Sequence, residues 1–153
     1  MNSPPRPSLA VPPPARTLNE PEQERRYNEL ANLVFARYAP ATDDELRLTN
    51  DILLGAWLLR HWKSRSAAAR RTYRAAKVAN ESDPAVAQLR ETWRYVEDQA
   101  TRQAMYLGRR KQAFADLRTA YEATLAHSGF TLADVRHTWL SQLSPNLPMP
   151  EAA

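Results

Sequence analysis

Residues 43–79 read DDELRLTNDILLGAWLLRHWKSRSAAARRTYRAAKVA, a stretch that contains no proline and one glycine. Apolar and small side chains recur in it at alternating steps of four and three residues, which is the spacing of one continuous helical face. The members of this seam are Leu48, Ile52, Gly55, Leu59, Trp62, Ser66, Ala69, Tyr73 and Ala76. We therefore predict a single long helix over 43–79.

A second seam with the same spacing follows a short turn at 80–83, where Pro84 suits the first turn of a new helix. Its members are Val86, Leu89, Trp93, Val96, Ala100, Gln103, Leu107, Arg110, Phe114, Leu117 and Tyr121. Two long helices with matching seams and a four-residue connection are expected to fold back on each other. The sequence thus predicts an antiparallel helical hairpin of about 43–79 and 84–127, with 52–59 opposite about 104–111. Continuity of the second helix through Gly108 is left open, because glycine weakens a helix interior.

Two shorter helices are predicted at about 20–38 and 132–143. Pro40 ends the first, and Thr42 with Glu45 forms a capping box that starts the long helix. Near 52–59 the long helix is apolar almost all round, so we expect both short helices to cover it as a four-helix base. In this all-α arrangement the first short helix returns along 43–79 and the last along 84–127. Only the hairpin continues beyond residue 61, as a projecting arm of about 61–102.

Proline is concentrated at the two ends of the chain. Nine of the twelve prolines lie at 1–14 and 145–150, where they oppose helix formation. We predict disorder for a proline-rich leader at 1–18 and for a tail at 144–153, which leaves 19–143 as one helical domain. The leader is interpreted as a solvated segment, with docking on a proline-recognising domain as the alternative.

Composition limits the classes of protein. The chain has no cysteine, which excludes disulfides and thiolate metal sites. Its longest apolar run, 52–59, is far shorter than the roughly 20 residues that a membrane-spanning helix needs. The repeated prolines of the leader also break any apolar segment typical of a secretory signal. We expect a cytoplasmic protein that does not bind membranes.

The charge is unevenly distributed. Residues 61–102 contain nine basic and five acidic residues, whereas the rest of the chain balances, and 52–80 hold seven basic residues without an acid. Five of these basic residues follow one side of the predicted helix next to its apolar seam. This basic stripe, the candidate binding surface, comprises Arg60, Lys63, Arg70, Arg74 and Lys77.

Two functions fit the stripe and the arm. The arm is expected to bind another protein or a second copy of the chain. Polar Gln103 and Arg110 in the second seam would then mark where packing loosens or a partner enters, and the alternative is that they only set the register of the hairpin. The alternative is an accessory protein whose basic stripe binds nucleic acid. A purely structural interpretation pairs Arg65 with Asp98, and Arg71 with Glu91, across the hairpin.

A search for catalytic chemistry finds no constellation in the sequence. His61, His127 and His137 are scattered, and Asp134 is the one acid a helical turn from His137, whereas a metal site needs three or four ligands. The chain contains no glycine-rich phosphate loop, zinc-protease motif or serine-hydrolase elbow. We predict a non-enzymatic protein without cofactor or metal.

The order FARYAPAT at 35–42, the acidic helix start at 43–45 and AWLLR at 56–60 resemble a loose family of small, mostly uncharacterised, all-helical bacterial proteins. That family has a Tyr/Phe-x-Pro break, an acidic cap, a Trp-Leu-x-Arg segment and a later helix rich in Tyr and Arg, which 95–114 resembles. The resemblance covers about 22–117. It implies a bacterial source and no particular activity.

Overall fold

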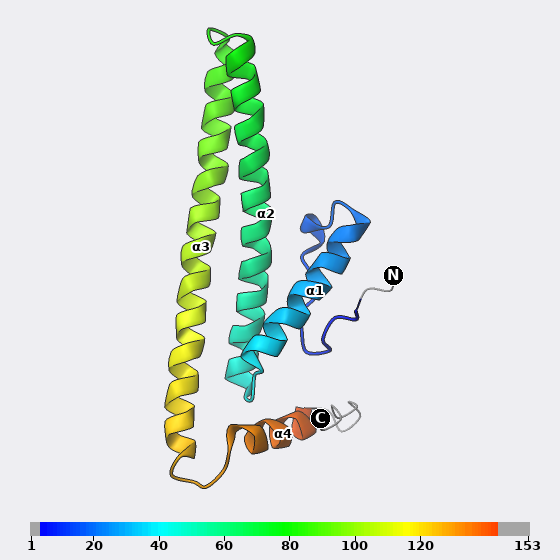
Figure 1. The fold of residues 1–153 in the computed structure, drawn as a ribbon, viewed down its shortest axis with the longest axis vertical. Helices are drawn as coiled ribbons and strands as arrows, with labels where there is room; N and C mark the ends of the chain where they lie inside the picture. Colours follow the sequence, from blue (N-terminus) through cyan, green and yellow to red (C-terminus); the bar gives the residue numbers. More distant parts are fainter. Residues whose placement is uncertain (1–3, 144–153) are drawn as a thin grey trace.

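The computed structural model describes residues 4–143, and every regular element within that range is helical (Figure 1). The elements are a short 3₁₀ turn η1 (Ala15–Thr17) and four α-helices, α1 (Pro21–Tyr38), α2 (Asp43–Ala79), α3 (Pro84–Leu125) and α4 (Leu132–Leu143). The predicted all-α class and the four predicted helices are confirmed.

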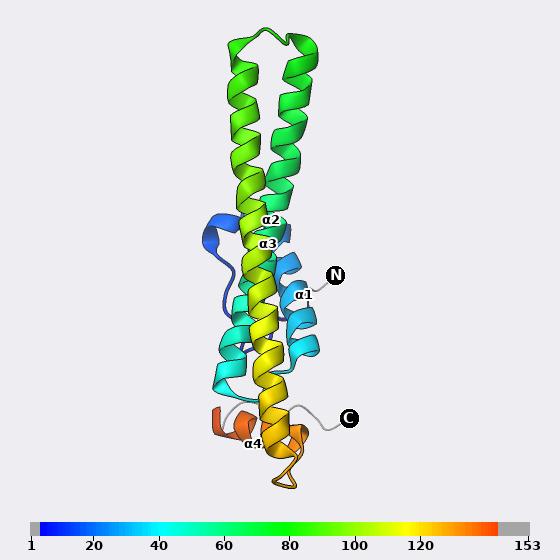
Figure 2. The same cartoon turned by 90° about the vertical axis from the view of Figure 1, so that its left-hand side faces the viewer.

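The long helices α2 and α3 run antiparallel and side by side along α2, and the end of α3 extends past the start of α2 (Figures 1 and 2). A Cβ on Gly55 would lie 3.3 Å from Cδ1 of Leu107, so α2 and α3 approach closely at the predicted pairing of 52–59 with 104–111. The hairpin and its register are therefore confirmed. Helix α3 continues through Gly108, which faces open space on the surface of the helix.

Local side-chain chemistry sets where the two long helices begin. The hydroxyl of Thr42 accepts a hydrogen bond from the backbone N–H of Glu45 at 3.2 Å. At the start of α3 the Asp83 carboxylate accepts one from the N–H of Ala85 at 2.9 Å, and Pro84 occupies the first turn. These contacts satisfy backbone donors that a helix start leaves unpaired.

The hydrophobic core lies in the lower half of the hairpin, where α1 covers the side of α2 that faces away from α3 (Figure 1). Tyr27 meets Trp57 edge to face at 5.3 Å between ring centroids, and Tyr38 meets Phe114 at 4.9 Å. The other buried apolar members of this cluster are Ala10, Leu30, Ala31, Val34, Ile52, Leu53 and Leu107. This cluster forms the base of the molecule.

Above α1 only α2 and α3 continue, and they form a slender arm (Figures 1 and 2). Its interior is narrow: Tyr73 stacks on Trp93 at 5.6 Å, and Val86 and Val96 are the other buried side chains of α2 and α3 in this region. Because two helices alone bury one seam each, most of the arm's surface stays exposed to solvent.

The leader differs from its predicted disorder at 1–18, because residues 4–18 pack on the base. Asn50 of α2 accepts a hydrogen bond from the N–H of Val11 at 2.9 Å and donates one to the carbonyl of Leu9 at 3.1 Å. The hydroxyl of Tyr27 donates to the Val11 carbonyl at 2.6 Å, and Thr17 is buried. Prolines prevent helix formation but permit this extended path, whose backbone groups bond to side chains of α1 and α2. The predicted disordered tail at 144–153 lies outside the described residues.

Helix α4 does not return along α3 as expected; it lies across the end of the base, near the α1–α2 connection (Figures 1 and 2). Its buried Trp139 donates from Nε1 to the Asp43 carboxylate at 2.9 Å, and Arg136 donates from Nε to the Pro40 carbonyl at 3.2 Å. The chain turns towards this position at Gly129, whose φ of +76° is accessible to glycine without steric cost.

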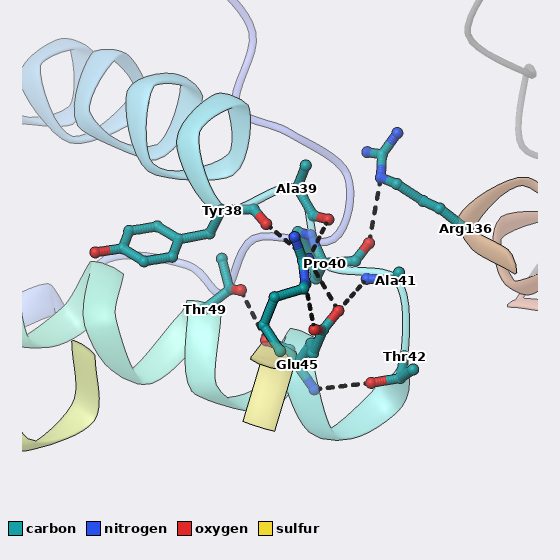
Figure 3. A network of polar contacts seen from close by, with 9 residues as sticks. Tyr38, Ala39, Pro40, Ala41, Thr42, Glu45, Thr49 and Arg136 are labelled. Atoms are coloured by element: carbon teal, nitrogen blue, oxygen red, sulfur yellow. Dashed lines mark hydrogen bonds and ion pairs between the residues drawn. The ribbon is translucent and has the colours of Figure 1, made fainter. Parts of the chain in front are cut away.

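A buried ion pair locks the α1–α2 connection to α3 (Figure 3). The Glu45 carboxylate accepts from Nε of Arg118 at 2.6 Å and from the N–H of Ala41 at 2.8 Å. The same guanidinium donates to the carbonyls of Tyr38 and Ala39, each at 3.0 Å. Side-chain exposure is 1% for Glu45 and 18% for Arg118, so each charge is stabilised by the other in place of water.

Candidate anion-binding site

All five residues of the basic stripe are exposed on α2. Lys77, near the tip, lies 4.0 Å from Glu81, a weak exposed pair. Arg60, Lys63, Arg70 and Arg74 form no ion pair with any residue in 4–143. The stripe therefore presents largely uncompensated positive charge to solvent.

The cross-hairpin pairs that would have neutralised α2 are not formed in the structure. Asp98 binds Arg102 at 3.0 Å, and Glu91 binds Arg94 at 3.4 Å, both within α3. The ion pairs that join α2 to α3 in the described part of the chain lie in the base, at Glu45–Arg118 and Asp51–Arg110. The acidic residues of α3 in the arm thus form no ion pair with α2.

The two polar residues of the α3 seam, Gln103 and Arg110, are both half-buried in the base. Gln103 lies beside Gly55, and Arg110 pairs with Asp51 at 3.8 Å while it stacks over the Tyr106 ring at 4.9 Å. Both contact α2, at Gly55 and Asp51. Their role as the place where a partner enters stays a prediction.

A hollow of about 880 Å³ lies at the foot of the arm, between α2 and the segment that links η1 to the start of α1. We call it the arginine pocket. Its lining residues are Arg16, Thr17, Asn19, Gln23, Arg26, Trp57, Leu58, Arg60, His61, Trp62, Ser64 and Arg65.

Four arginines line this pocket: Arg16 from η1, Arg26 from α1, and Arg60 and Arg65 from α2. No lining residue is acidic, and none of the four arginines forms an ion pair within residues 4–143. Arg65 lies over the Trp62 ring, with its guanidinium carbon 5.3 Å from the ring centroid. The pocket is therefore cationic and has an aromatic wall.

The local charge acts on His61. Burial lowers its pKa below the usual 6.5, and the positive charges of Arg65 and Arg16 lower it further. The imidazole is consequently neutral at pH 7, and it supplies a hydrogen-bonding ring rather than a further positive charge.

The packed leader brings Arg16 to the pocket. The indole N–H of Trp57 donates to the hydroxyl of Thr17 at 2.7 Å, and that hydroxyl donates to the Pro14 carbonyl at 2.7 Å. At the start of α1, Oε1 of Gln23 accepts from the N–H of Asn19 at 2.6 Å. The first bond holds η1 against α2, and the others order the chain locally on either side of Thr17.

The pocket and most of the basic stripe lie on different faces of α2. At about 100° per residue, His61 and Arg65 point almost opposite to Lys63 and Arg70. Lys63 and Arg70 instead border a smaller hollow of about 420 Å³ between α2 and α3, beside Trp93. Arg60 is the one stripe residue that lines the arginine pocket.

Sequence reasoning missed the pocket because two of its arginines lie far from α2 in the chain. Arg16 belongs to a leader predicted to be disordered, and Arg26 lies on a helix whose relation to α2 at this position depends on tertiary packing. The detectable signal was the acid-free run at 52–80. It identified Arg60 and Arg65 as basic residues without revealing what they face.

Other kinds of site receive no support from the geometry. In the described range no three His, Cys, Asp or Glu side chains come together in a way that could hold a metal ion. His137 lies on α4 and His127 precedes it, both far along the chain from His61. No helix within residues 4–143 is long and apolar enough to span a membrane.

The fold defines an all-helical protein in which a long hairpin projects from a helical base. Comparison with family models, curated proteins and solved structures finds no match to this chain. The resemblance to small helical bacterial proteins stays a prediction.

Proposed function

We propose that this protein is a non-enzymatic, cytoplasmic accessory protein that binds nucleic acid along the basic stripe of α2. The observation that carries the proposal is the acid-free run at 52–80, whose charge the acids of α3 leave unpaired. Lys and Arg side chains that contact phosphates release condensed counterions, and this release drives binding. From Arg60 to Lys77 the stripe is about 25 Å long at 1.5 Å per residue, enough to contact several successive phosphates.

The smaller hollow beside Trp93, which we call the groove, has a lining that suits a nucleic-acid strand better than a compact anion. Lys63 and Arg70 border this groove, and the half-buried Trp93 offers an aromatic surface for a base. Glu97 also lines it, so phosphates are expected to lie on the α2 side and bases nearer to α3.

The test measures binding of the full chain to fluorescently labelled single-stranded and duplex oligonucleotides by anisotropy, at salt concentrations from 50 to 300 mM. These concentrations bracket physiological ionic strength, where counterion release makes affinity strongly salt-dependent. The stripe variant is Arg70→Glu/Arg74→Glu/Lys77→Glu. Its control, Arg90→Glu/Arg94→Glu/Arg102→Glu, changes the net charge equally on exposed residues of α3.

We expect affinity to fall steeply with salt, and the stripe variant to bind at least tenfold more weakly than the control. Equal weakening in both variants would mean that net charge, and not the stripe, drives association. Absence of binding at 50 mM salt would refute the proposal.

A second candidate is binding to another protein or to a second copy of this chain through the arm. Large apolar side chains on α3 favour it: Tyr95 and Met105 are each 60% exposed, a poor arrangement for a surface that stays in water. Light scattering at increasing concentration tests self-association. A concentration-dependent dimer that Tyr95→Ala/Met105→Ala abolishes would support it, and a monomer throughout would exclude a second copy.

A further inference from the structure

The arginine pocket gathers four like charges that form no ion pair within residues 4–143. Arg16, Arg26, Arg60 and Arg65 come from three separate segments, so helical periodicity alone does not place them around one hollow. Bringing guanidinium groups together raises their mutual repulsion, and an anion in the hollow would relieve it. Phosphate is the best-matched anion because its oxygens accept the paired N–H groups of arginine.

The other walls of the pocket suit the remainder of a nucleotide. Trp62 is half-buried and meets His61 edge to face at 5.7 Å, which gives the hollow an aromatic side. Ser64 and Asn19 add small hydrogen-bonding groups that suit sugar hydroxyls and base edges. The volume of about 880 Å³ lies within the size range of small-molecule sites.

We propose that the arginine pocket binds a nucleoside phosphate, with the phosphate on Arg16, Arg26, Arg60 and Arg65 and the base against Trp62. The same chemistry is offered by a free nucleotide and by the phosphorylated 5′ end of a strand. The pocket lies on a different face of α2 from Lys63 and Arg70 and shares only Arg60 with the stripe of the proposed function. Variants that leave Arg60 unchanged therefore test the two sites independently.

The leader is part of this site. Arg16 reaches the pocket because Thr17, next to it, is held by the Trp57 indole. Residues of η1, α1 and α2 therefore have to be in place together, and the test uses the full chain.

The experiment compares AMP with adenosine by titration calorimetry, and a 5′-phosphorylated oligonucleotide with its 5′-hydroxyl form by anisotropy. The pocket variant is Arg16→Gln/Arg65→Gln, and Arg26→Gln alone is a milder second variant. The matched control is Arg74→Gln/Lys77→Gln, which removes the same charge from the stripe. Circular dichroism checks that each variant keeps its helix content.

We expect AMP to bind at least tenfold more tightly than adenosine if the ligand is a free nucleotide. A comparable preference for the phosphorylated oligonucleotide alone would identify a strand end. With either ligand, the preference for the phosphorylated form should fall at least tenfold in the pocket variant. It should fall less in Arg26→Gln and persist in the control. Absence of any phosphate preference, or a preference that survives Arg16→Gln/Arg65→Gln in the folded protein, would overturn the proposal while leaving the stripe untouched.

Discussion

At the scale of single residues, Glu45 and Arg118 form the least exposed ion pair within residues 4–143. Its members are 73 positions apart in sequence, and Glu45 is also the residue that accepts the N–H of Ala41 at the start of α2. The Thr-x-x-Glu spacing predicts a capping box, of which the bond from the Glu45 N–H to the Thr42 hydroxyl is formed. The reciprocal bond differs, because the Glu45 carboxylate accepts from the N–H of Ala41 and not from that of Thr42. The ion pair of Glu45 with Arg118 could not be predicted from the sequence, because a glutamate in the first turn of a helix normally faces water.

We expect Glu45→Ala to lower the free energy of unfolding by about 3–5 kcal/mol, since it leaves Arg118 buried without its counter-ion. Urea denaturation measures the change. Asp44→Ala is the neighbouring control. The side chains of Asp44 and its partner Arg47 are 67% and 73% exposed, so this ion pair should contribute less than about 1 kcal/mol. Equal costs for the two substitutions would show that the buried pair contributes no more than an exposed one.

His61 gives the protein a stability that depends on pH. Its pKa in the folded protein lies below the unfolded value of 6.5, so the unfolded chain takes up the proton first as the pH falls. The contribution of His61 is therefore present above about pH 6.5 and is lost as the pH falls through the lower, folded pKa. His61→Asn cannot titrate and should lose less stability between pH 7.5 and pH 5.5 in urea denaturation than the wild type. The same loss in both proteins would contradict the role of His61.

At the scale of elements, the two glycines of the hairpin occupy opposite environments. Gly55 lies at the point where α2 meets Leu107, whereas no atom lies within 4 Å of a Cβ on Gly108. The sequence raised Gly108 as the place where α3 could be interrupted. The helix continues there because glycine weakens a helix by only about 1 kcal/mol, which a long packed seam on both sides overcomes.

Gly108→Ala should raise the free energy of unfolding by about 0.5–1 kcal/mol, because it adds helix propensity and meets no neighbour. Gly55→Val should lower it by about 1–3 kcal/mol, since the added methyl groups overpack the contact with Leu107. Thermal unfolding of the two variants beside the wild type measures both changes. The same sign for both substitutions would contradict the close approach of α2 and α3 at Gly55.

At the scale of the whole molecule, the leader joins the base to the arginine pocket. Asn50 accepts from Val11 and donates to Leu9, and these two bonds hold an otherwise helix-incompatible segment on α2. Asn50→Ala removes both bonds, each contributing about 1 kcal/mol, and should raise the open population of the leader roughly thirtyfold.

Tryptic cleavage after Arg16 reports this opening, and we expect it to accelerate in Asn50→Ala. Thr72→Ala is the control, because the Thr72 hydroxyl bonds only to the Ala68 carbonyl of its own helix. Cleavage at the wild-type rate in Asn50→Ala would mean that the prolines of the leader, rather than its bonds to α2, keep it in place.

The sequence by itself determined the helices, their boundaries, the hairpin and its register. These features follow from local propensity, from capping residues such as Thr42, and from two seams with the same spacing, all of which act within a few helical turns. The position of α4, the packing of the leader and the grouping of Arg16 with Arg65 were decided only by the tertiary structure. They depend on contacts between distant segments, such as Trp57 with Thr17 and Trp139 with Asp43, that no periodicity encodes. The sequence therefore located the charge on α2, and the packing of the leader against α2 formed the pocket.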